Sequence, residues 1–183
     1  MDIDSNKKNI TFDFKGIKKI VNYDVLVITT GLKDNGFNLN SDNSIFISPF
    51  TTPENLKNIL DFISSKKPKH ITLIGSGFVN LEIADNLKYI GIEVSIVEIS
   101  SKIMGKNFDD DIQPYLYSNL IKNLDLNLKT EVDYIKNKKV FLKNGKSFYT
   151  DGIIYSIGGP VNKEIFKKTK IAFGSMGGIK TDK

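Results

Sequence analysis

The pattern of apolar and polar residues predicts two strands near the start of this chain. Residues 10–14 alternate apolar and polar side chains, as a half-buried strand does. Residues 24–28 are almost continuously apolar and predict a short strand that ends at Thr29-Thr30-Gly31. Residues 1–9 are polar and are expected to fray, and residues 33–44 are expected to form a loop.

A helix is predicted to begin within residues 51–54. Thr51 and Glu54 have the spacing of a capping box, and Pro53 falls in the first helical turn, where no backbone N–H is needed. Residues 64–68 are expected to end the helix. Its apolar face follows the helical period through Leu56, Ile59, Leu60 and Ile63.

From residue 70 onward the pattern alternates between strand and helix. We expect a strand at 70–74, a tight turn at 75–77, a helix at 78–90 closed by Gly91, and a strand at 93–97. A further helix opens at the three Asp residues 109–111, which complement the positive end of its dipole more simply than they form a metal site. The expected buried stripe of this helix is Ile112, Leu116, Leu120 and Leu124.

The remaining strands complete the predicted fold class. Short strands are expected at 131–135, 139–142 and 147–149, with a hairpin turn at 143–146. A last buried strand at 153–157 stops at Gly158-Gly159-Pro160. The chain is therefore predicted to be α/β, with a parallel sheet and a β-meander inserted before the final strand.

The turn at residues 75–77 carries the strongest chemical signal. Gly75 permits the tight turn, and Gly77 lets the backbone approach a pyrophosphate at the start of the next helix. Glu98 ends the second strand about 20 residues further on, where a carboxylate accepts both ribose hydroxyls of an adenosine. Since this carboxylate repels a 2′-phosphate, the pattern predicts a Rossmann-like NAD(H) site and disfavours NADP.

Asn80 departs from this fingerprint. The third position of the motif normally holds Gly or Ala, so that helix and strand pack closely. Two outcomes are open for Asn80: a small shift of the helix, or weaker cofactor binding.

Composition excludes several other kinds of site. The chain has 183 residues, no Cys and one His, His70. A disulfide framework, a Cys/His zinc site, a Cys nucleophile and a redox dithiol are therefore excluded within it, and no metal site is predicted. A Ser-His-Asp triad could use only His70 as its base.

Charge and hydropathy bear on partners and location. The net charge of +5 comes with 26 Lys and no Arg, so the bidentate fork that reads bases and phosphates is missing and no nucleic-acid partner is expected. No apolar run approaches the roughly 20 residues of a membrane helix. The first residues lack the apolar region of a signal peptide. We expect a cytoplasmic protein without a membrane partner, and its oligomeric state stays open.

The motifs resemble those of the pyridine nucleotide-disulfide oxidoreductases. Residues 74–82 look like the NAD-domain signature of this family, in its branch of NADH oxidases, coenzyme A-disulfide reductases, rubredoxin reductases and nitrite reductases. Residues 23–31 resemble the strand that ends in Ala-Thr-Gly, with Thr29 in place of Ala. Residues 156–162 resemble the second Gly motif, and residues 177–180 the turn and strand after it.

The resemblance implies roles for further residues. Phe78 would gate the nicotinamide pocket over the flavin, and Glu82 would lie near the nicotinamide. The alternatives are that Phe78 packs in the core and that Glu82 is a solvated helix residue. Thr30 and Gly31 could contact FAD, but only in a complete enzyme. The full set implied for NAD(H) is Gly75, Ser76, Gly77, Phe78, Val79, Glu82, Glu98 and Gly158.

The resemblance also implies a domain organisation. Residues 1–50 and 160–183 would be parts of an FAD domain, and residues 51–159 a complete NAD(H)-binding domain. Whether the two FAD-domain parts pair with each other is open. The family's own FAD fingerprint, its redox Cys, its Gly-Asp flavin motif and its dimerisation domain are not seen here.

The predicted function is that of the central NAD(H)-binding domain of an FAD-dependent NADH oxidoreductase. It would hold nicotinamide for hydride transfer to flavin, with the rest of the FAD domain as its partner, and would be inactive alone. One alternative is a non-catalytic Rossmann-like module for interaction or regulation. A stand-alone NAD-dependent dehydrogenase is a further alternative, for which no proton-transfer residue can be named. The electron acceptor stays open.

Overall fold

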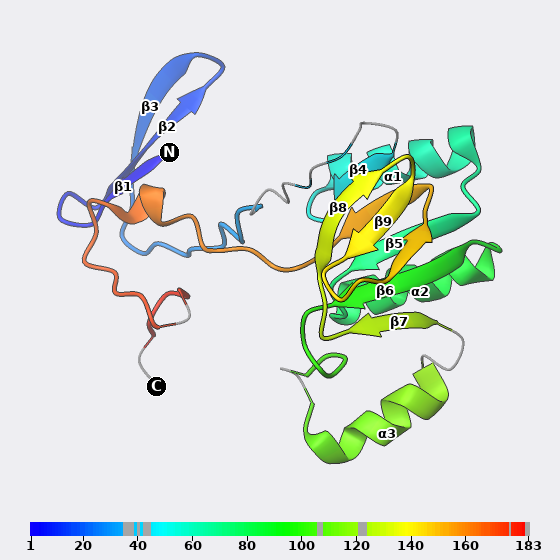
Figure 1. Cartoon of the computed structure of the whole chain (residues 1–183). Coiled ribbons are helices and arrows are strands. Elements are labelled where there is room, and N and C mark those ends of the chain that lie inside the picture. The colour runs from blue at the N-terminus through cyan, green and yellow to red at the C-terminus, as the bar shows by residue number, and fades with distance from the viewer. Residues whose placement is uncertain are drawn as a thin grey trace. The chain divides into compact units, whose positions relative to one another are not determined.

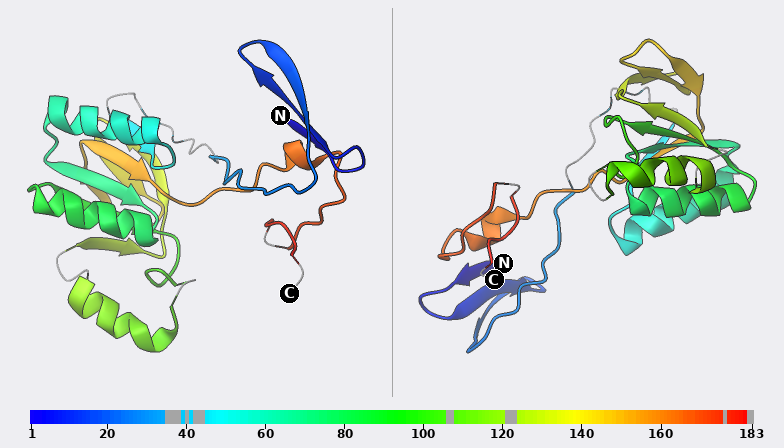
Figure 2. Two further views of the ribbon diagram at one scale, coloured as in Figure 1. Left: turned by 180° about the vertical axis from the view of Figure 1, so that it is seen from behind. Right: turned by 90° about the horizontal axis from the view of Figure 1, so that it is seen from below.

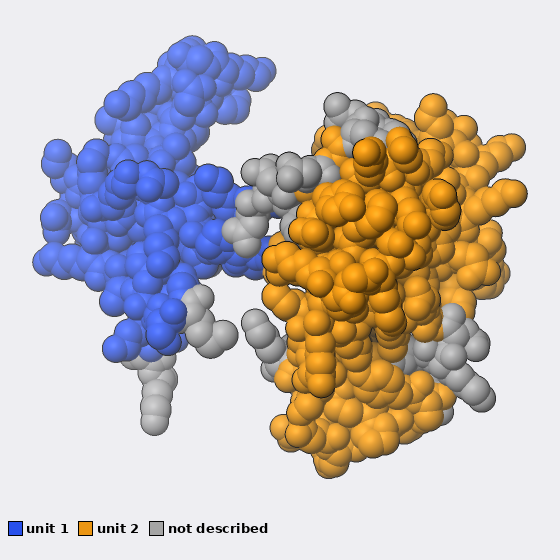
Figure 3. All heavy atoms as spheres, in the orientation of Figure 1, with its two compact units in different colours: residues 1–35, 158–183 blue, residues 36–157 orange. Residues whose placement is uncertain are grey.

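Five parallel strands form the sheet on which the candidate site is built. The computed structural model describes residues 1–34, 39, 41, 45–105, 108–120, 124–175 and 177–181. Their contacts separate into a middle unit, Gly36–Ile157, and a terminal unit, Met1–Asn35 with Gly158–Lys183 (Figure 3). The sheet belongs to the middle unit and has the order β4-β11-β5-β6-β7 (Figure 1). The strands span Phe46–Pro49 (β4), Gly152–Tyr155 (β11), His70–Ile74 (β5), Glu93–Glu98 (β6) and Asp125–Leu128 (β7).

Helices cover one face of this sheet and a β-meander covers the other (Figure 2). The helices are α1 (Pro53–Lys66) and α2 (Phe78–Tyr89). The meander is an antiparallel sheet of β8 (Val132–Lys136), β9 (Lys139–Leu142) and β10 (Ser147–Tyr149). The predicted fold class, a parallel α/β sheet with a meander before the last strand, is confirmed.

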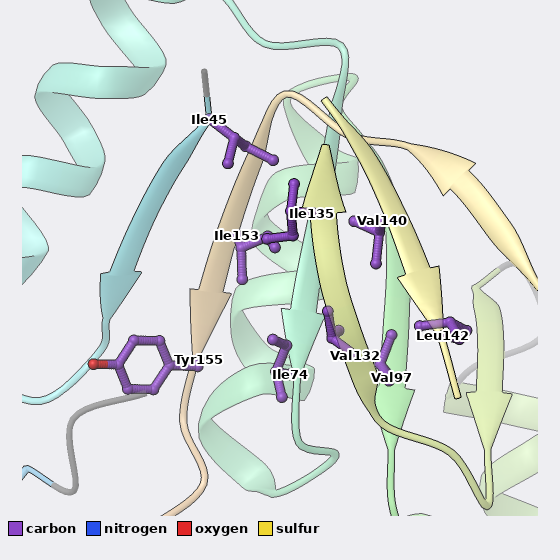
Figure 4. Packing of buried hydrophobic residues seen from close by; sticks show 9 residues of the cluster. All are labelled: Ile45, Ile74, Val97, Val132, Ile135, Val140, Leu142, Ile153 and Tyr155. Carbon is purple, nitrogen blue, oxygen red and sulfur yellow. The ribbon is translucent and has the colours of Figure 1, made fainter. Parts of the chain in front are cut away.

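Each face of the sheet has its own apolar core. Alternation along a strand sends successive side chains to opposite faces. Thus Leu73 of β5 packs with Ala84 and Leu87 of α2, whereas the next residue, Ile74, packs on the meander face. Figure 4 shows this second cluster, in which Ile74, Val97 and Ile153 meet Val132, Ile135, Val140 and Leu142.

Helix α1 begins one residue later than the capping-box spacing predicted. Its N-cap is Thr52, whose Oγ1 accepts a hydrogen bond from the Asn55 N–H at 3.2 Å. The hydroxyl of Thr51 instead donates to Asn55 Oδ1 at 2.8 Å. Pro53 explains the shift, because proline favours the first helical position and the residue before it then becomes the cap.

The helical segment after the three Asp residues is irregular. It begins as a 3-10 helix, η1 (Asp110–Ile112), and continues through α3 (Gln113–Tyr115) into the π-helical η2 (Leu116–Leu120). Leu116 is buried as predicted, but Ile112 is 38% exposed, and Gln113 is buried in its place. The 3-10 helix has three residues per turn, fewer than an α-helix, so Ile112 is turned away from the face that was expected to be buried. Leu124 is partly buried, and the side chain of Leu120 lies outside the described part of the chain.

The terminal unit corrects two predictions. Its sheet joins β1 (Asp2–Asp4), β2 (Asn9–Phe14) and β3 (Ile17–Asn22), so the first residues pair instead of fraying. Ile3 is 2% exposed and packs with Ile165 and Phe166, of which both lie in the 3-10 helix η3 (Lys163–Phe166). Residues 24–28 do not form a strand. The alternation of buried and exposed side chains is kept, since Leu26 packs against this cluster and Val25 is exposed, but residues 24–28 pair with no strand in the described part of the chain.

The two ends of the chain pack together within the terminal unit. Isolated bridges join Asp4 to Lys168 and Leu32 to Val161. The sequence left open whether the two flanking segments pair, and in the described residues they do. The expected boundary at residue 51 falls inside the middle unit, because β4 pairs with β11. The division into FAD-domain and NAD-domain parts stays a prediction.

The amino edge of the parallel sheet holds the single histidine. His70 Nε2 lies 2.9 Å from Ser95 Oγ, which donates to Asp125 Oδ2 at 2.7 Å. Burial lowers the pKa of His70 below its ordinary 6.5, although the carboxylates of Asp125, Asp151 and Glu93 act in the opposite direction. The folded chain therefore favours the neutral imidazole.

In the described residues, no helix is long and apolar enough to cross a bilayer.

We expect the stability of the chain to fall as His70 becomes protonated. Since its folded pKa is lowered, its contribution is complete above the unfolded pKa of about 6.5 and is lost as the pH falls through the folded pKa. Thermal unfolding at about pH 7.5 and about pH 5.5 should show a smaller loss of Tm for His70→Gln than for the wild type. An equal loss in both proteins would contradict this assignment.

Candidate functional site at the carboxyl edge of the sheet

The turn between β5 and α2 requires a glycine at position 75. Gly75 has a φ of +94°, and a Cβ there would lie 2.8 Å from the carbonyl oxygen of Ser156. Its N–H donates to the carbonyl of Val97 at 2.9 Å, which ties the turn to the neighbouring strand β6. Both the conformation and the close approach of the backbone that follows β11 therefore exclude a side chain.

Gly77 is different, because the fold itself does not require it. It is the N-cap of α2 with φ −74° and ψ 173°, and a Cβ there would meet no atom within 4 Å. No described side chain caps the helix, and its first turn contains no acidic residue. The start of α2 thus presents backbone N–H groups, with the positive end of the helix dipole, to open space. This arrangement suits an anion such as a pyrophosphate.

Glu98 at the end of β6 reaches back to this turn. Its Oε2 accepts hydrogen bonds from the N–H of Ser76 at 2.8 Å and from the hydroxyl of Ser76 at 2.7 Å. Its Oε1 accepts from the N–H of Ser100 at 2.7 Å. The carboxylate is thereby fixed beside the glycine turn, at the carboxyl ends of two adjacent parallel strands. In open α/β sheets this edge is where ligands bind.

Asn80 supports the turn from beneath. The residue is 0% exposed, and its Nδ2 donates to the carbonyls of Ile74 at 2.7 Å and Gly75 at 2.9 Å. Its Oδ1 is buried without a hydrogen-bond partner among the described residues. The amide therefore donates to two carbonyls where β5 ends, and the Ile74 carbonyl also accepts from the Ser156 N–H at 3.1 Å.

The other residues expected on α2 lie on its accessible side. Phe78 is 53% exposed, which excludes the core-packing alternative, and its ring meets that of Phe108 edge to face at 5.8 Å. Val79 is 37% exposed. Glu82, one turn further along, is exposed, as a solvated helix residue is.

The remaining expected residues belong to the terminal unit. Thr30, Gly31 and Gly158 are exposed there, and the two glycines have φ of +65° and +74°. The segments on which they lie are joined by a hydrogen bond from the Lys33 N–H to the Pro160 carbonyl at 2.8 Å. The structure therefore brings together Gly75, Ser76, Gly77 and Glu98, while the roles of Gly158 for NAD(H) and of Thr30 and Gly31 for FAD stay predictions.

Three contributors to the site were not foreseen as such from the sequence. They are the hydroxyl of Ser76 as a donor to Glu98, the N–H of Ser100 and the ring of Phe108. Ser76 carried a usable signal, since a polar residue between the two glycines faces the end of the adjacent strand. Ser100 and Phe108 lie in the loop after β6, whose path no local pattern predicts.

Comparison with known proteins defines the family. The model of the pyridine nucleotide-disulphide oxidoreductases matches residues 1–183. The chain belongs to this family. It is a family of oxidoreductases whose members use FAD and NAD(H).

Curated relatives include coenzyme A disulfide reductases of staphylococci. The chain is 27% identical to that of Staphylococcus epidermidis over 158 residues, which is 86% of this chain and 35% of the relative. It is 28% identical to that of Staphylococcus aureus over 158 residues, with the same shares of 86% and 35%. The chain thus spans about a third of the length of these relatives.

Solved structures share the fold. Reduced Bacillus anthracis CoADR-RHD matches with a TM-score of 0.84 and 27% identity, over 97% of this chain and 33% of that one. The water-forming NADH oxidase from Lactobacillus brevis, bound to NADH, matches with a TM-score of 0.78 and 21% identity, over 96% of this chain and 40% of that one. At that identity the second likeness concerns the fold alone.

The two glycines of the turn should respond differently to alanine. Gly75→Ala should lower the free energy of unfolding by about 2 kcal/mol, because the left-handed conformation and the Ser156 carbonyl both oppose a Cβ. Gly77→Ala should cost less than about 1 kcal/mol, which is the difference between glycine and alanine at an N-cap. Urea denaturation measures both values, and equal losses would contradict the geometry of the turn.

Asn80 should matter for stability far more than an exposed Asn on the same helix. Asn80→Ala should lower the free energy of unfolding by about 1–3 kcal/mol, since it leaves the Gly75 carbonyl without its amide donor and removes one of two donors from the Ile74 carbonyl. Asn86 makes a similar bond, from Nδ2 to the Glu82 carbonyl at 2.8 Å, but is exposed. Asn86→Ala is therefore the control and should change stability by less than about 0.5 kcal/mol. Similar effects of the two substitutions would argue against a buried brace.

Proposed function

We propose that this chain supplies the NAD(H)-binding part of an FAD-dependent oxidoreductase. The observation that carries the proposal is the convergence of the Gly75–Gly77 turn, the uncapped start of α2 and the Glu98 carboxylate on one edge of the sheet. These features suit the dinucleotide, because Gly77 leaves open space where a pyrophosphate would approach the helix.

Each of these groups has a task in holding the cofactor. The first N–H groups of α2 bind the pyrophosphate, and the absence of a side chain at Gly77 lets it approach. Glu98 accepts a ribose hydroxyl of the adenosine half and repels a 2′-phosphate, which favours NAD(H) over NADP(H). Ser76 and Val79 belong to the same contact surface as parts of the signature run.

The nicotinamide half would lie towards the exposed side chains of α2. The bound dinucleotide supplies the hydride, which in this family of enzymes goes to a flavin. The half-exposed ring of Phe78, braced by Phe108, is suited to gate that end of the cofactor, and Glu82 lies one turn beyond it. Gly158, Thr30 and Gly31 would take part in a complete enzyme together with the rest of an FAD domain.

A non-catalytic module for interaction or regulation is the second candidate. Asn80 favours it, because this buried amide occupies the position that the dinucleotide fingerprint keeps small. Such a module would keep the fold without binding the cofactor.

Direct binding decides between the two candidates. Calorimetric titration of the 183-residue chain should show saturable binding of NADH, weaker binding of NADPH and no binding of FAD, and no turnover by the chain alone. Absence of NADH binding would overturn the proposal and favour the non-catalytic module.

Substitution of Glu98 locates the site. Glu98→Ala should weaken NADH at least about tenfold, a loss of roughly 1.4 kcal/mol, and should reduce the preference over NADPH, because the ribose acceptor and the negative charge disappear together. Glu93→Ala, at the exposed opposite end of the same strand, is the control and should leave both affinities unchanged. Unchanged affinities in Glu98→Ala would remove Glu98 from the site.

A further inference from the structure

Ser76 makes more contacts with Glu98 than a spacer between two glycines needs. It is 2% exposed, and both its N–H and its hydroxyl donate to the same carboxylate oxygen, Oε2, at 2.8 and 2.7 Å. Its Oγ also accepts a hydrogen bond from the N–H of Met104 at 3.3 Å. The hydroxyl therefore links three segments: the turn after β5, the end of β6 and the loop that follows β6.

These bonds make the two oxygens of Glu98 unequal. Among the described residues, Oε2 has two donors, both from Ser76, which occupy both of its lone pairs, whereas Oε1 has one donor, the N–H of Ser100. Oε1 is therefore the oxygen with capacity for an incoming hydroxyl group. The same bonds keep the carboxylate in one rotamer, although a free Glu side chain has considerable rotational freedom.

We infer that Ser76 is a positioning residue for the choice between the two nicotinamide dinucleotides. Its hydroxyl holds Glu98 so that Oε1 faces the adenosine ribose and the negative charge cannot rotate away from a 2′-phosphate. The inference rests on the proposed function, because it assumes that the dinucleotide ribose meets Glu98. The inference extends the proposed function, because it assigns the choice between NADH and NADPH to Ser76 and Glu98 together instead of to Glu98 alone.

A positioning role for Ser76 predicts a specific pattern of affinities. Without the hydroxyl, Glu98 keeps the bonds from the N–H groups of Ser76 and Ser100 but loses one of its three donors, so its carboxylate gains freedom to turn. The ribose of NADH then loses a well-aligned carboxylate acceptor. The 2′-phosphate of NADPH is repelled less, because the negative charge of Glu98 is no longer held in place. Ser76→Ala should weaken NADH about fivefold to tenfold and leave NADPH unchanged or slightly tighter, so the ratio of the two dissociation constants should fall by at least about fivefold.

The experiment is a double-mutant cycle on the 183-residue chain. Calorimetry measures the dissociation constants of NADH and NADPH for the wild type, Ser76→Ala, Glu98→Ala and the double variant. Thermal unfolding verifies that each protein is folded. Adding Ser76→Ala to Glu98→Ala should leave the NADH to NADPH ratio unchanged, since the hydroxyl then has no carboxylate to hold. Ser101→Ala, at an exposed serine in the same loop, should behave as wild type.

The outcomes separate this inference from the proposed function. Wild-type binding of NADH with an unaltered ratio in Ser76→Ala, or an equal change in ratio with and without Glu98, would overturn the role of Ser76 alone. Lack of NADH binding by the wild type would overturn the proposed function itself. Ser76→Cys, a weaker donor of similar shape, should give a smaller fall in the ratio than Ser76→Ala, and it serves as the test if Ser76→Ala does not fold.

Discussion

The parallel pairing of β5 with β6 is the interaction on which the candidate site depends. In this register Ile74 lies opposite Val97, so the glycine turn after one strand and the acid at the end of the other emerge side by side. The bond from Gly75 N–H to the Val97 carbonyl, at 2.9 Å, fixes the distance between them. A slip of one residue would send every side chain of the strand to the opposite face, and Glu98 would no longer meet Ser76.

The local sequence pattern was sufficient to predict the elements whose apolar residues follow a clear helical or strand period. The helix from Pro53, the β5–α2–β6 succession and the meander were predicted close to their observed bounds. Two of the errors concern the pairing of strands, which apolar alternation alone does not reveal. Residues 24–28 were predicted as a strand but have no strand assignment, while β1 is short and polar and becomes a strand because β2 pairs with it.

The candidate site shows the same division. The spacing from Gly75 to Glu98 reflects the geometry of a strand–helix–strand unit, so it could be read directly from the sequence. The bonds of Asn80 and Ser76 could not, because they depend on where buried side chains point after packing. Asn80 looked like a defect in the fingerprint, yet its amide meets two carbonyls that a glycine at this position would leave without that donor.

The terminal unit is assembled from both ends of the chain, and this has a consequence for the order of folding. The middle unit is one continuous segment, Gly36–Ile157, whereas Asp4 meets Lys168 only after that whole segment has been synthesised. During vectorial synthesis the middle unit can complete its sheet first. Its folding then shortens the distance that the two ends must search, and so lowers the loop-closure entropy that opposes their pairing. Folding of the middle unit would thus help the two segments that flank it to find each other.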